Sequence, residues 1–156
     1  MNNLRAEIER YFDRLWPICR SLAGPGFRES LDILSELIPT ERFKFKSGET
    51  VFDWTVPNEW VIRDAYLIDP KGKKRADFKV NNLHIVSHSI PFSGTIALKE
   101  LKLHLHSLPE EPGAIPYVTS YYKEDWGFCL THRELRSLPD GNYRVFIDSE
   151  LKPGHL

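Results

Sequence analysis

The sequence has little cysteine, almost no net charge and no long apolar run, and each absence excludes a class of protein. Its two cysteines, Cys19 and Cys129, lie outside any CxxC pattern, which argues against a disulfide framework and a thiolate zinc site. The formal net charge is −1, so we expect neither a nucleic-acid nor a membrane partner. No apolar run reaches the roughly 18 residues of a membrane-spanning helix. The charged N-terminus is unlike a signal peptide, and we therefore expect a cytoplasmic protein with reduced thiols.

Residues 1–40 carry the apolar spacing of two short amphipathic helices joined by a turn. Pro17 and Pro39 should end these helices, because proline removes a backbone donor and clashes with the preceding turn. The connecting Gly24-Pro25-Gly26 lacks the lysine and the glycine spacing of a phosphate-binding loop, so we interpret it as a turn. The apolar positions are Leu4, Ile8, Tyr11, Phe12 and Leu15 in the first helix and Phe27, Leu31, Leu34 and Ile38 in the second.

From residue 40 onward the pattern becomes mostly that of β-strands. Residues around a Ser47-Gly48 turn alternate between apolar and polar, which predicts strands and makes four residues available for a core: Phe43, Phe45, Val51 and Trp54. Apolar and β-branched residues predict three further strands, at 60–69, 81–91 and 142–151.

Two helices are predicted among these strands. A leucine repeat over residues 95–109 predicts a helix that ends at Pro109. Thr131 and Glu134 have the spacing of a capping box, which predicts a short helix, and Asp140-Gly141 predicts a hairpin turn. The predicted class is therefore α+β: an N-terminal helical pair plus a mostly antiparallel β-rich domain with two short helices.

The most unusual stretch is Ile115–Cys129, where aromatic side chains gather among charged residues. Tyrosine and tryptophan offer a stacking face and a polar edge, as carbohydrate and peptide sites require. For Tyr121, Tyr122 and Trp126, core packing and ligand contact are both open, and we take these three as candidate substrate-binding residues. Core packing is the preferred interpretation for Tyr117 and Phe128.

No complete catalytic or metal-binding constellation follows from the residues alone. His84 and His88 lie four residues apart on a predicted strand, hence about 13 Å apart along it, too far to share one metal ion without a bulge. We therefore assign neither catalytic residues nor metal ligands. A metalloenzyme site assembled by tertiary contacts stays open as a minor alternative, and would draw on His84, His88, His104 and His132.

Five stretches, taken together, are distinctive in their order along nearly the whole chain. They are WPICRSLAG (16–24), VFDWTVPNEWVIRDAYLID (51–69), NNLHIVSHSIP (81–91), LHSLPEEPGAIPYVTSYYKEDWGFC (105–129) and YRVFIDSEL (143–151). This ordered set resembles the N-terminal portion of a bacterial zinc-aminopeptidase-like family that is often associated with polysaccharide biosynthesis. One departure is His88, which stands where the family's SYSIP-like segment would have an aromatic residue.

The resemblance implies a protein of three parts: an α/β aminopeptidase-like core with co-catalytic zinc, a β-rich domain inserted into it, and a C-terminal winged helix. Residues 1–50 would supply the N-terminal helices and first strand of an incomplete core, and residues 51–156 the inserted domain. The family's zinc ligands lie in a later segment. Zinc is therefore expected in the full-length family, and the resemblance assigns no zinc ligand and no catalytic residue to this chain.

The leading hypothesis is an N-terminal fragment or truncated homologue of a zinc-dependent aminopeptidase-like hydrolase. It would supply the accessory β domain that shapes the substrate cleft, and would be inactive alone. Its expected partner is the missing C-terminal aminopeptidase core, in the same chain or as a separate polypeptide. Without that partner, an exposed edge and apolar patch should cause self-association. The alternative is a free-standing β-rich module that binds carbohydrate or peptide through an aromatic surface.

Overall fold

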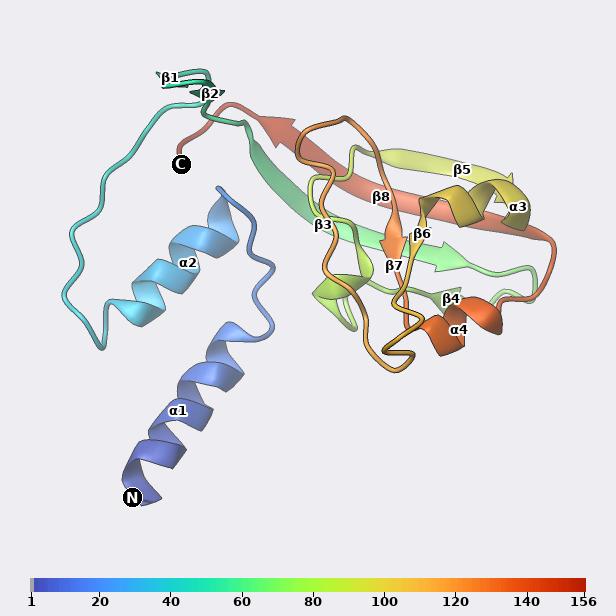
Figure 1. The fold of residues 1–156 in the computed structure, drawn as a ribbon, viewed down its shortest axis with the longest axis horizontal. Coiled ribbons are helices and arrows are strands. Elements are labelled where there is room, and N and C mark those ends of the chain that lie inside the picture. The colour runs from blue at the N-terminus through green and yellow to red at the C-terminus, as the bar shows by residue number, and fades with distance from the viewer. Residues whose placement is uncertain (1) are drawn as a thin grey trace. The chain divides into compact units, whose positions relative to one another are not determined.

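The computed structural model describes residues 2–156, and their side chains from Leu4 onward. The chain divides into two compact units: a helical unit, made of the residues up to 61 and of 151–156, and a sheet unit, made of 62–150 (Figure 1). The predicted α+β class, with N-terminal helices followed by a mostly antiparallel β-rich region, is confirmed. The predicted boundary at residue 50 separates residues expected to belong to the aminopeptidase-like core from those of the inserted domain. It does not describe compact units, and it stays a prediction.

In the helical unit, α1 (Asn2–Leu15) and α2 (Pro25–Leu34) form where the apolar spacing predicted them. α1 ends two residues before Pro17, as expected from the missing proline donor. Gly24 precedes α2 with a φ of 122°, a conformation that residues with a Cβ rarely adopt. A Cβ at Gly24 would also lie 3.2 Å from the carbonyl oxygen of Trp60, so the turn between the helices requires glycine.

The segment that follows α2 contains less strand than its alternation predicted. Within residues 35–58, the strands are β1 (Thr50–Val51) and β2 (Trp54–Thr55), which pair antiparallel. The Ser47-Gly48 turn forms, but residues 41–45 are not a strand. The prediction that Phe43 and Phe45 belong to a core is wrong, because no layer of the described helical unit covers them and the Phe43 side chain is 70% exposed.

Four strands of the sheet lie in the order β4–β3–β8–β5. β3 (Glu59–Ile68) and β8 (Asn142–Lys152) are its long central strands, and both occupy the positions that the sequence predicted. β4 (Lys74–Arg75) pairs antiparallel with β3, and β5 (Phe92–Ala97) pairs antiparallel with β8. The edge strand β4 pairs over two residues, whereas β5 pairs with β8 over all six of its residues.

The core of the sheet unit follows the period-two alternation of β8. Tyr143, Val145 and Ile147 are at most 2% exposed, whereas Arg144 between them is exposed. This confirms the predicted buried face of the strand. The other large contributors to the core are equally buried, and they are Leu67, Leu101, Phe128 and Leu130.

A layer of short elements completes the sheet unit. Its elements are η1 (Asn82–His84), α3 (Leu98–Leu101), η2 (Lys102–His104), β6 (Leu105–His106), β7 (Phe128–Cys129) and α4 (His132–Arg136). β6 and β7 pair in parallel. Ser89 ties this layer to the sheet, because its carbonyl oxygen accepts a hydrogen bond from Ser149 Oγ of β8 at 2.7 Å and its hydroxyl accepts one from Gly127 N at 3.2 Å.

The predicted strand at 81–91 is wrong. The side-chain oxygen of Asn81 accepts a hydrogen bond from Leu83 N, which begins the short 3-10 helix η1. Seven residues after Asn81, His88 takes a φ of 67°, which no extended strand contains. The segment therefore contributes isolated bridges at Ile85 and Ser87 instead of a regular strand.

The predicted helix at 95–109 is also wrong over most of its length. Thr95 and Ile96 lie in β5, because these β-branched residues pair with the neighbouring strand β8. The helix α3 covers four residues and is followed by η2 and β6. The leucine repeat still marks core positions, since Leu98, Leu101 and Leu105 are buried.

The capping box of α4 is confirmed. Thr131 Oγ1 accepts a hydrogen bond from Glu134 N at 3.1 Å, and the Glu134 carboxylate accepts one from Thr131 N at 3.2 Å. Asp140-Gly141 forms a bend between α4 and β8 rather than a hairpin turn. Among residues 2–156, no helix combines the length and the apolarity that crossing a membrane requires.

Candidate functional site

Trp126 anchors the aromatic loop that precedes β7. Its ring stacks on Phe92 of β5, with centroids 4.3 Å apart, and on His104 of η2, with centroids 3.9 Å apart. His104 Nδ1 also donates a hydrogen bond to the Trp126 carbonyl oxygen at 2.8 Å. The Trp126 side chain is only 9% exposed. It therefore fixes the end of the loop against the sheet unit and offers little ring surface to a ligand.

Gly127 lets the loop backbone approach η2. A Cβ at this position would lie 2.8 Å from the carbonyl oxygen of His104, closer than real Cβ atoms come, and at a tight 3.1 Å from the Val86 side chain. The position therefore requires glycine for close backbone approach, although its φ lies outside the left-handed region. Trp126 and Gly127 together hold the loop in one place.

Tyr121 and Tyr122 form the outward part of the same loop. Their rings meet edge to face, with centroids 4.6 Å apart. The Tyr122 side chain is 89% exposed, whereas Tyr121 is half-buried and its ring meets the ring of His88 at 5.4 Å. The pair thus presents two nearly perpendicular ring surfaces, and the His88 ring that Tyr121 contacts is buried.

His88, in the segment that follows η1, supports the Tyr121 ring. Its ring is buried, its Nδ1 lies 3.1 Å from Ser87 Oγ, and burial lowers the pKa of the imidazole from 6.5. The ring is therefore neutral at pH 7. Ser87 fixes the loop by its backbone, because its N–H donates to the Val118 carbonyl and its own carbonyl accepts from Ser120 N, each at 2.9 Å.

The structure separates the three predicted contact residues. Tyr121 and Tyr122 lie together on a surface, and Trp126 lies in the core layer. Their role in binding a substrate stays a prediction, which burial makes weakest for Trp126. Core packing is confirmed for Phe128, which is fully buried, and is wrong for Tyr117, which is exposed.

The histidines do not assemble a metal site. His84 Nδ1 donates to the Cys129 carbonyl oxygen at 2.8 Å, and His132 Nδ1 lies 2.9 Å from Ser107 Oγ. Within the part of the chain that the structure describes, no group of three His, Cys, Asp or Glu side chains could hold a metal ion. The histidine metalloenzyme alternative therefore fails for the described residues, and we derive no metal-dependent step from them.

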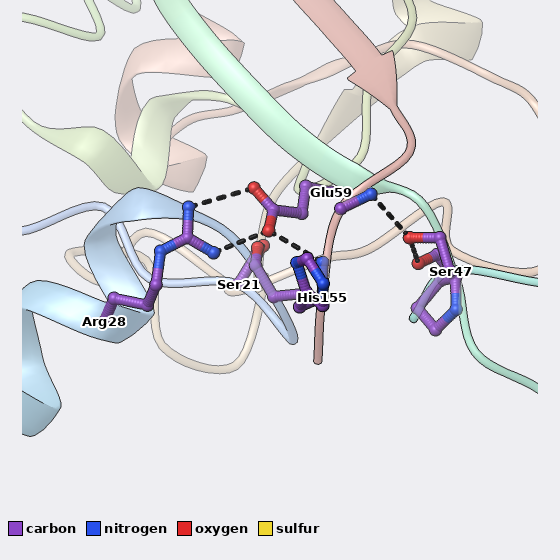
Figure 2. A network of polar contacts seen from close by, with 8 residues as sticks. Ser21, Arg28, Ser47, Glu59 and His155 are labelled. Carbon is purple, nitrogen blue, oxygen red and sulfur yellow. Dashed lines mark hydrogen bonds and ion pairs between the residues drawn. The ribbon is translucent and has the colours of Figure 1, made fainter. Parts of the chain in front are cut away.

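A second polar cluster lies in the helical unit, around the buried carboxylate of Glu59 (Figure 2). Arg28 of α2 donates to both Glu59 oxygens, at 2.5 and 3.0 Å, and His155 N donates to Oε1 at 2.9 Å. The hydrogen bonds from Arg28 lower the pKa of Glu59 below its usual value, against the opposing effect of burial. Beside it, Ser47 Oγ donates to the Pro57 carbonyl and accepts from Gly154 N.

This cluster borders a cavity of about 300 Å³, whose walls include Phe27 and Leu31 of α2 and the charged Arg42 and Lys44. Most of its charges are already paired, since Arg28 binds Glu59 and Arg42 binds Asp32 at 2.6 Å. We therefore interpret the cluster as a structural tie between α2, the start of β3 and residues 154–155. Sequence reasoning overlooked Glu59, although a carboxylate directly before the apolar strand residues 60–62 signals a buried, paired charge.

The chain resembles two longer proteins over nearly its whole length. A Clostridium acetobutylicum protein, provisionally named as a polysaccharide biosynthesis protein with aminopeptidase-like domain, is 51% identical over 150 residues, which cover 96% of this chain and 35% of that protein. The crystal structure of a provisionally named peptidase from the same organism matches with a TM-score of 0.90 and 51% identity, over 97% of this chain and 36% of that one. The chain thus spans about a third of the length of these relatives. The family model described as a domain of unknown function (DUF2172) matches residues 59–150, more than half of the chain, and the chain therefore belongs to that family.

Proposed function

We propose that this chain is the N-terminal, non-catalytic portion of a zinc-dependent aminopeptidase-like hydrolase, and that its sheet unit borders the substrate cleft. Support for a hydrolase comes from the relatives, one named for an aminopeptidase-like domain and one as a peptidase. Zinc and the catalytic groups would lie in a further part of that protein, the aminopeptidase-like part, because the described residues offer no metal donor set. In this proposal, residues 1–50 belong to the aminopeptidase-like core and 51–156 form a domain inserted into it.

The observation that carries the accessory role is the exposed Tyr121–Tyr122 pair. The outward ring surface of the pair can pack against an apolar side chain of a peptide, while the phenol oxygens bind its backbone. The loop would meet a substrate with little loss of conformational entropy, because Trp126 and Gly127 hold its end and Ser87 holds its middle.

The test uses the natural polypeptide that carries these residues, at its full length, and a series of peptides whose first residue is small or apolar. Replacing Tyr121 or Tyr122 by alanine should raise KM for apolar peptides about 3- to 10-fold, since an aromatic contact contributes about 0.5–1.5 kcal/mol. The matched control is Tyr117→Ala, which removes another exposed tyrosine of the same stretch. Equal kinetics in all three variants, or the absence of peptide hydrolysis, would overturn the proposal.

A second candidate function is binding without hydrolysis. The exposed aromatic pair also suits the apolar face of a sugar ring, and one relative is named for polysaccharide biosynthesis. In titrations of the chain with oligosaccharides and peptides, followed by NMR, this function predicts shifts of the Tyr121 and Tyr122 ring signals. A polypeptide that binds these ligands through the two rings and hydrolyses no peptide would favour the second candidate over the first.

A further inference from the structure

β5 is the longer of the two edge strands of the four-stranded sheet, and its outer side has no neighbouring strand among residues 2–156 (Figure 1). On its inner side it pairs antiparallel with β8 over all six of its residues, Phe92–Ala97. An edge strand presents a row of unpaired backbone N–H and C=O groups to its surroundings. A further strand can therefore be added to the sheet at β5.

The register identifies the backbone groups that point outward. Directly opposite residues of an antiparallel pair alternate between those that exchange hydrogen bonds and those that do not. Leu98 N donates to the Gly141 carbonyl oxygen at 2.9 Å, in continuation of the β5–β8 register, so the even-numbered residues of β5 bind β8. The N–H groups of Ser93, Thr95 and Ala97, and the carbonyl oxygens of the first two, therefore face away from β8. Within the part of the chain that the structure describes, none of these groups makes a hydrogen bond.

The two edges of the sheet differ in how well they are protected. Natural sheets oppose strand addition with short edge strands, charged side chains and proline. β4 has the first two protections, since it consists of two basic residues, Lys74 and Arg75. β5 has none of the three, because it is six residues long and its sequence, FSGTIA, contains no charge and no proline. The chain thus protects one edge of the sheet and leaves the other accessible.

The free edge begins beside the aromatic loop of the candidate site. Phe92, the first residue of β5, stacks on Trp126, and its ring lies 3.3 Å from where a Cβ of Gly94 would be. Just before β5, Ile90 N donates to the Asp125 carbonyl oxygen at 3.0 Å. Six residues of β-strand extend about 20 Å. A peptide paired with β5 would therefore lie along the sheet and reach the loop that carries the exposed aromatic pair.

The chemistry of this edge favours an extended peptide. The outward donors and acceptors repeat every two residues, about 7 Å, and an extended peptide backbone has the same repeat. A second copy of the chain is less suited, because six residues a side are far fewer than the roughly 20–30 a side of a stable protein–protein interface. A substrate needs less contact, since KM values lie between about 1 μM and 1 mM.

We propose that the free edge of β5 binds the substrate peptide of the hydrolase as an added β-strand, through the outward backbone groups of Ser93, Thr95 and Ala97. The inference rests on the proposed function, which supplies the peptide. It adds which part of the substrate is recognised, namely the backbone of several residues beyond the first. The hydrolase would accordingly prefer extended peptides of several residues over dipeptides.

The first test is a scan of N-methylated octapeptides with the full-length natural polypeptide. Each peptide carries one N-methyl group, at a residue from the third to the eighth, which removes one backbone N–H. Because the N–H groups of an added strand face β5 at every second residue, KM should rise about 2- to 10-fold at alternate positions of the paired stretch. The intervening positions are the matched controls. Uniform KM values across the scan would overturn the proposal.

Amide exchange of the polypeptide, measured at single residues by NMR, locates the bound peptide. The probe is the unmethylated octapeptide with an acetylated N-terminus, which an aminopeptidase cannot shorten. At saturation the amides of Ser93, Thr95 and Ala97 should exchange at least 10-fold more slowly. Those of Gly94 and Ile96 bind β8 already and should not change. Unchanged exchange at the outward amides would overturn the proposal, and so would their protection without peptide, because a second copy or another segment would then occupy the edge.

The proposed function and this inference fail separately. Peptide hydrolysis without alternation of KM, and with unchanged exchange along β5, would overturn the inference alone. Slower exchange along β5 without hydrolysis of any peptide would overturn the proposed function alone, because the edge would then bind a peptide that the polypeptide does not cleave.

Discussion

The buried carboxylate of Glu59 should make the helical unit sensitive to one isosteric substitution. Glu59→Gln keeps the volume and one acceptor oxygen, but it turns an amide N–H₂ toward the donors of Arg28. Breaking a fully buried ion pair costs about 3–5 kcal/mol, and breaking an exposed one about 0.2–1 kcal/mol. Because the Glu59 side chain is 6% exposed and that of Arg28 is 45% exposed, we expect an intermediate loss of about 1–3 kcal/mol at pH 7.

The loss should depend on pH in a defined direction. Hydrogen bonds from Arg28, and then from the His155 N–H, lower the folded-state pKa of Glu59 below its ordinary value of 4.5, although burial opposes them. The unfolded chain therefore binds more protons at Glu59, so the stabilisation is present above pH 4.5 and is lost as the pH falls through the folded-state pKa. Glu59→Gln carries no such titration, and its stability should approach that of the unmodified chain as the pH falls below 4.5.

The measurement is urea unfolding at pH 7 and pH 3, followed by circular dichroism, together with hydrogen exchange at single amides. Gly154 and His155 should exchange faster in Glu59→Gln, because their N–H groups belong to the Glu59 cluster. The matched control is Asp148→Asn, which removes the negative charge of the more exposed pair with Arg63 and should cost at most about 1 kcal/mol. A loss as large at pH 3 as at pH 7 would refute the electrostatic reasoning.

Two further predictions concern the sheet unit and the thiols. Gly127→Ala should lower the free energy of unfolding by about 2 kcal/mol, because its Cβ would overlap the His104 carbonyl oxygen. The control Gly113→Ala should change the free energy of unfolding by less than about 0.5 kcal/mol. Equal effects of the two variants in urea unfolding would contradict the steric explanation. Burial raises the pKa of Cys129 to about 12 and that of Cys19 to about 11, so a thiol-specific reagent at pH 8 should label the folded chain slowly and the unfolded chain at once. Prompt labelling of both thiols in the folded chain would show that burial does not protect them.

The parts of the fold that local physics decides could be predicted from the sequence. The alternation that buries Tyr143, Val145 and Ile147 needs only the period of a strand, and the capping box of Thr131 and Glu134 needs only neighbouring residues. Both were confirmed. The two N-terminal helices were confirmed for the same reason, since their apolar spacing acts within each helix, but the predicted end of the second helix at Pro39 was wrong because α2 ends at Leu34.

The parts that distant contacts decide could not be predicted. Residues 95–97 directly precede a leucine repeat with helical spacing, yet they pair with β8, about 50 residues later in the chain. The strand pattern of 81–91 is overridden partly by the local Asn81 cap and partly by distant hydrogen bonds, from Val86 N to the Gly127 carbonyl and from Ser87 N to the Val118 carbonyl. Tertiary hydrogen bonds, which the local sequence does not contain, selected the observed backbone.

For the candidate site, the sequence indicated the aromatic loop but could not show which of its rings are buried and which are exposed. Trp126 and Tyr122 are four residues apart and equally aromatic. They differ because Phe92 and His104 lie where they can enclose Trp126, and nothing comparable lies over Tyr122. The Glu59 cluster was missed because its members come from three distant segments, although a carboxylate next to an apolar run is a usable signal.

The neighbouring positions of β3 and β8 have a consequence for the evolution and engineering of the chain. The sheet unit begins at Ile62 on one strand and ends at Glu150 on the strand beside it, and Arg63 pairs there with Asp148 at 2.6 Å. A segment whose two ends are this close can be gained or lost as a cassette, because a short turn can close the gap that it leaves. A laboratory deletion of residues 62–150, with residues 61 and 151 joined by a linker of about two or three residues, would show whether the helical unit folds without the sheet unit.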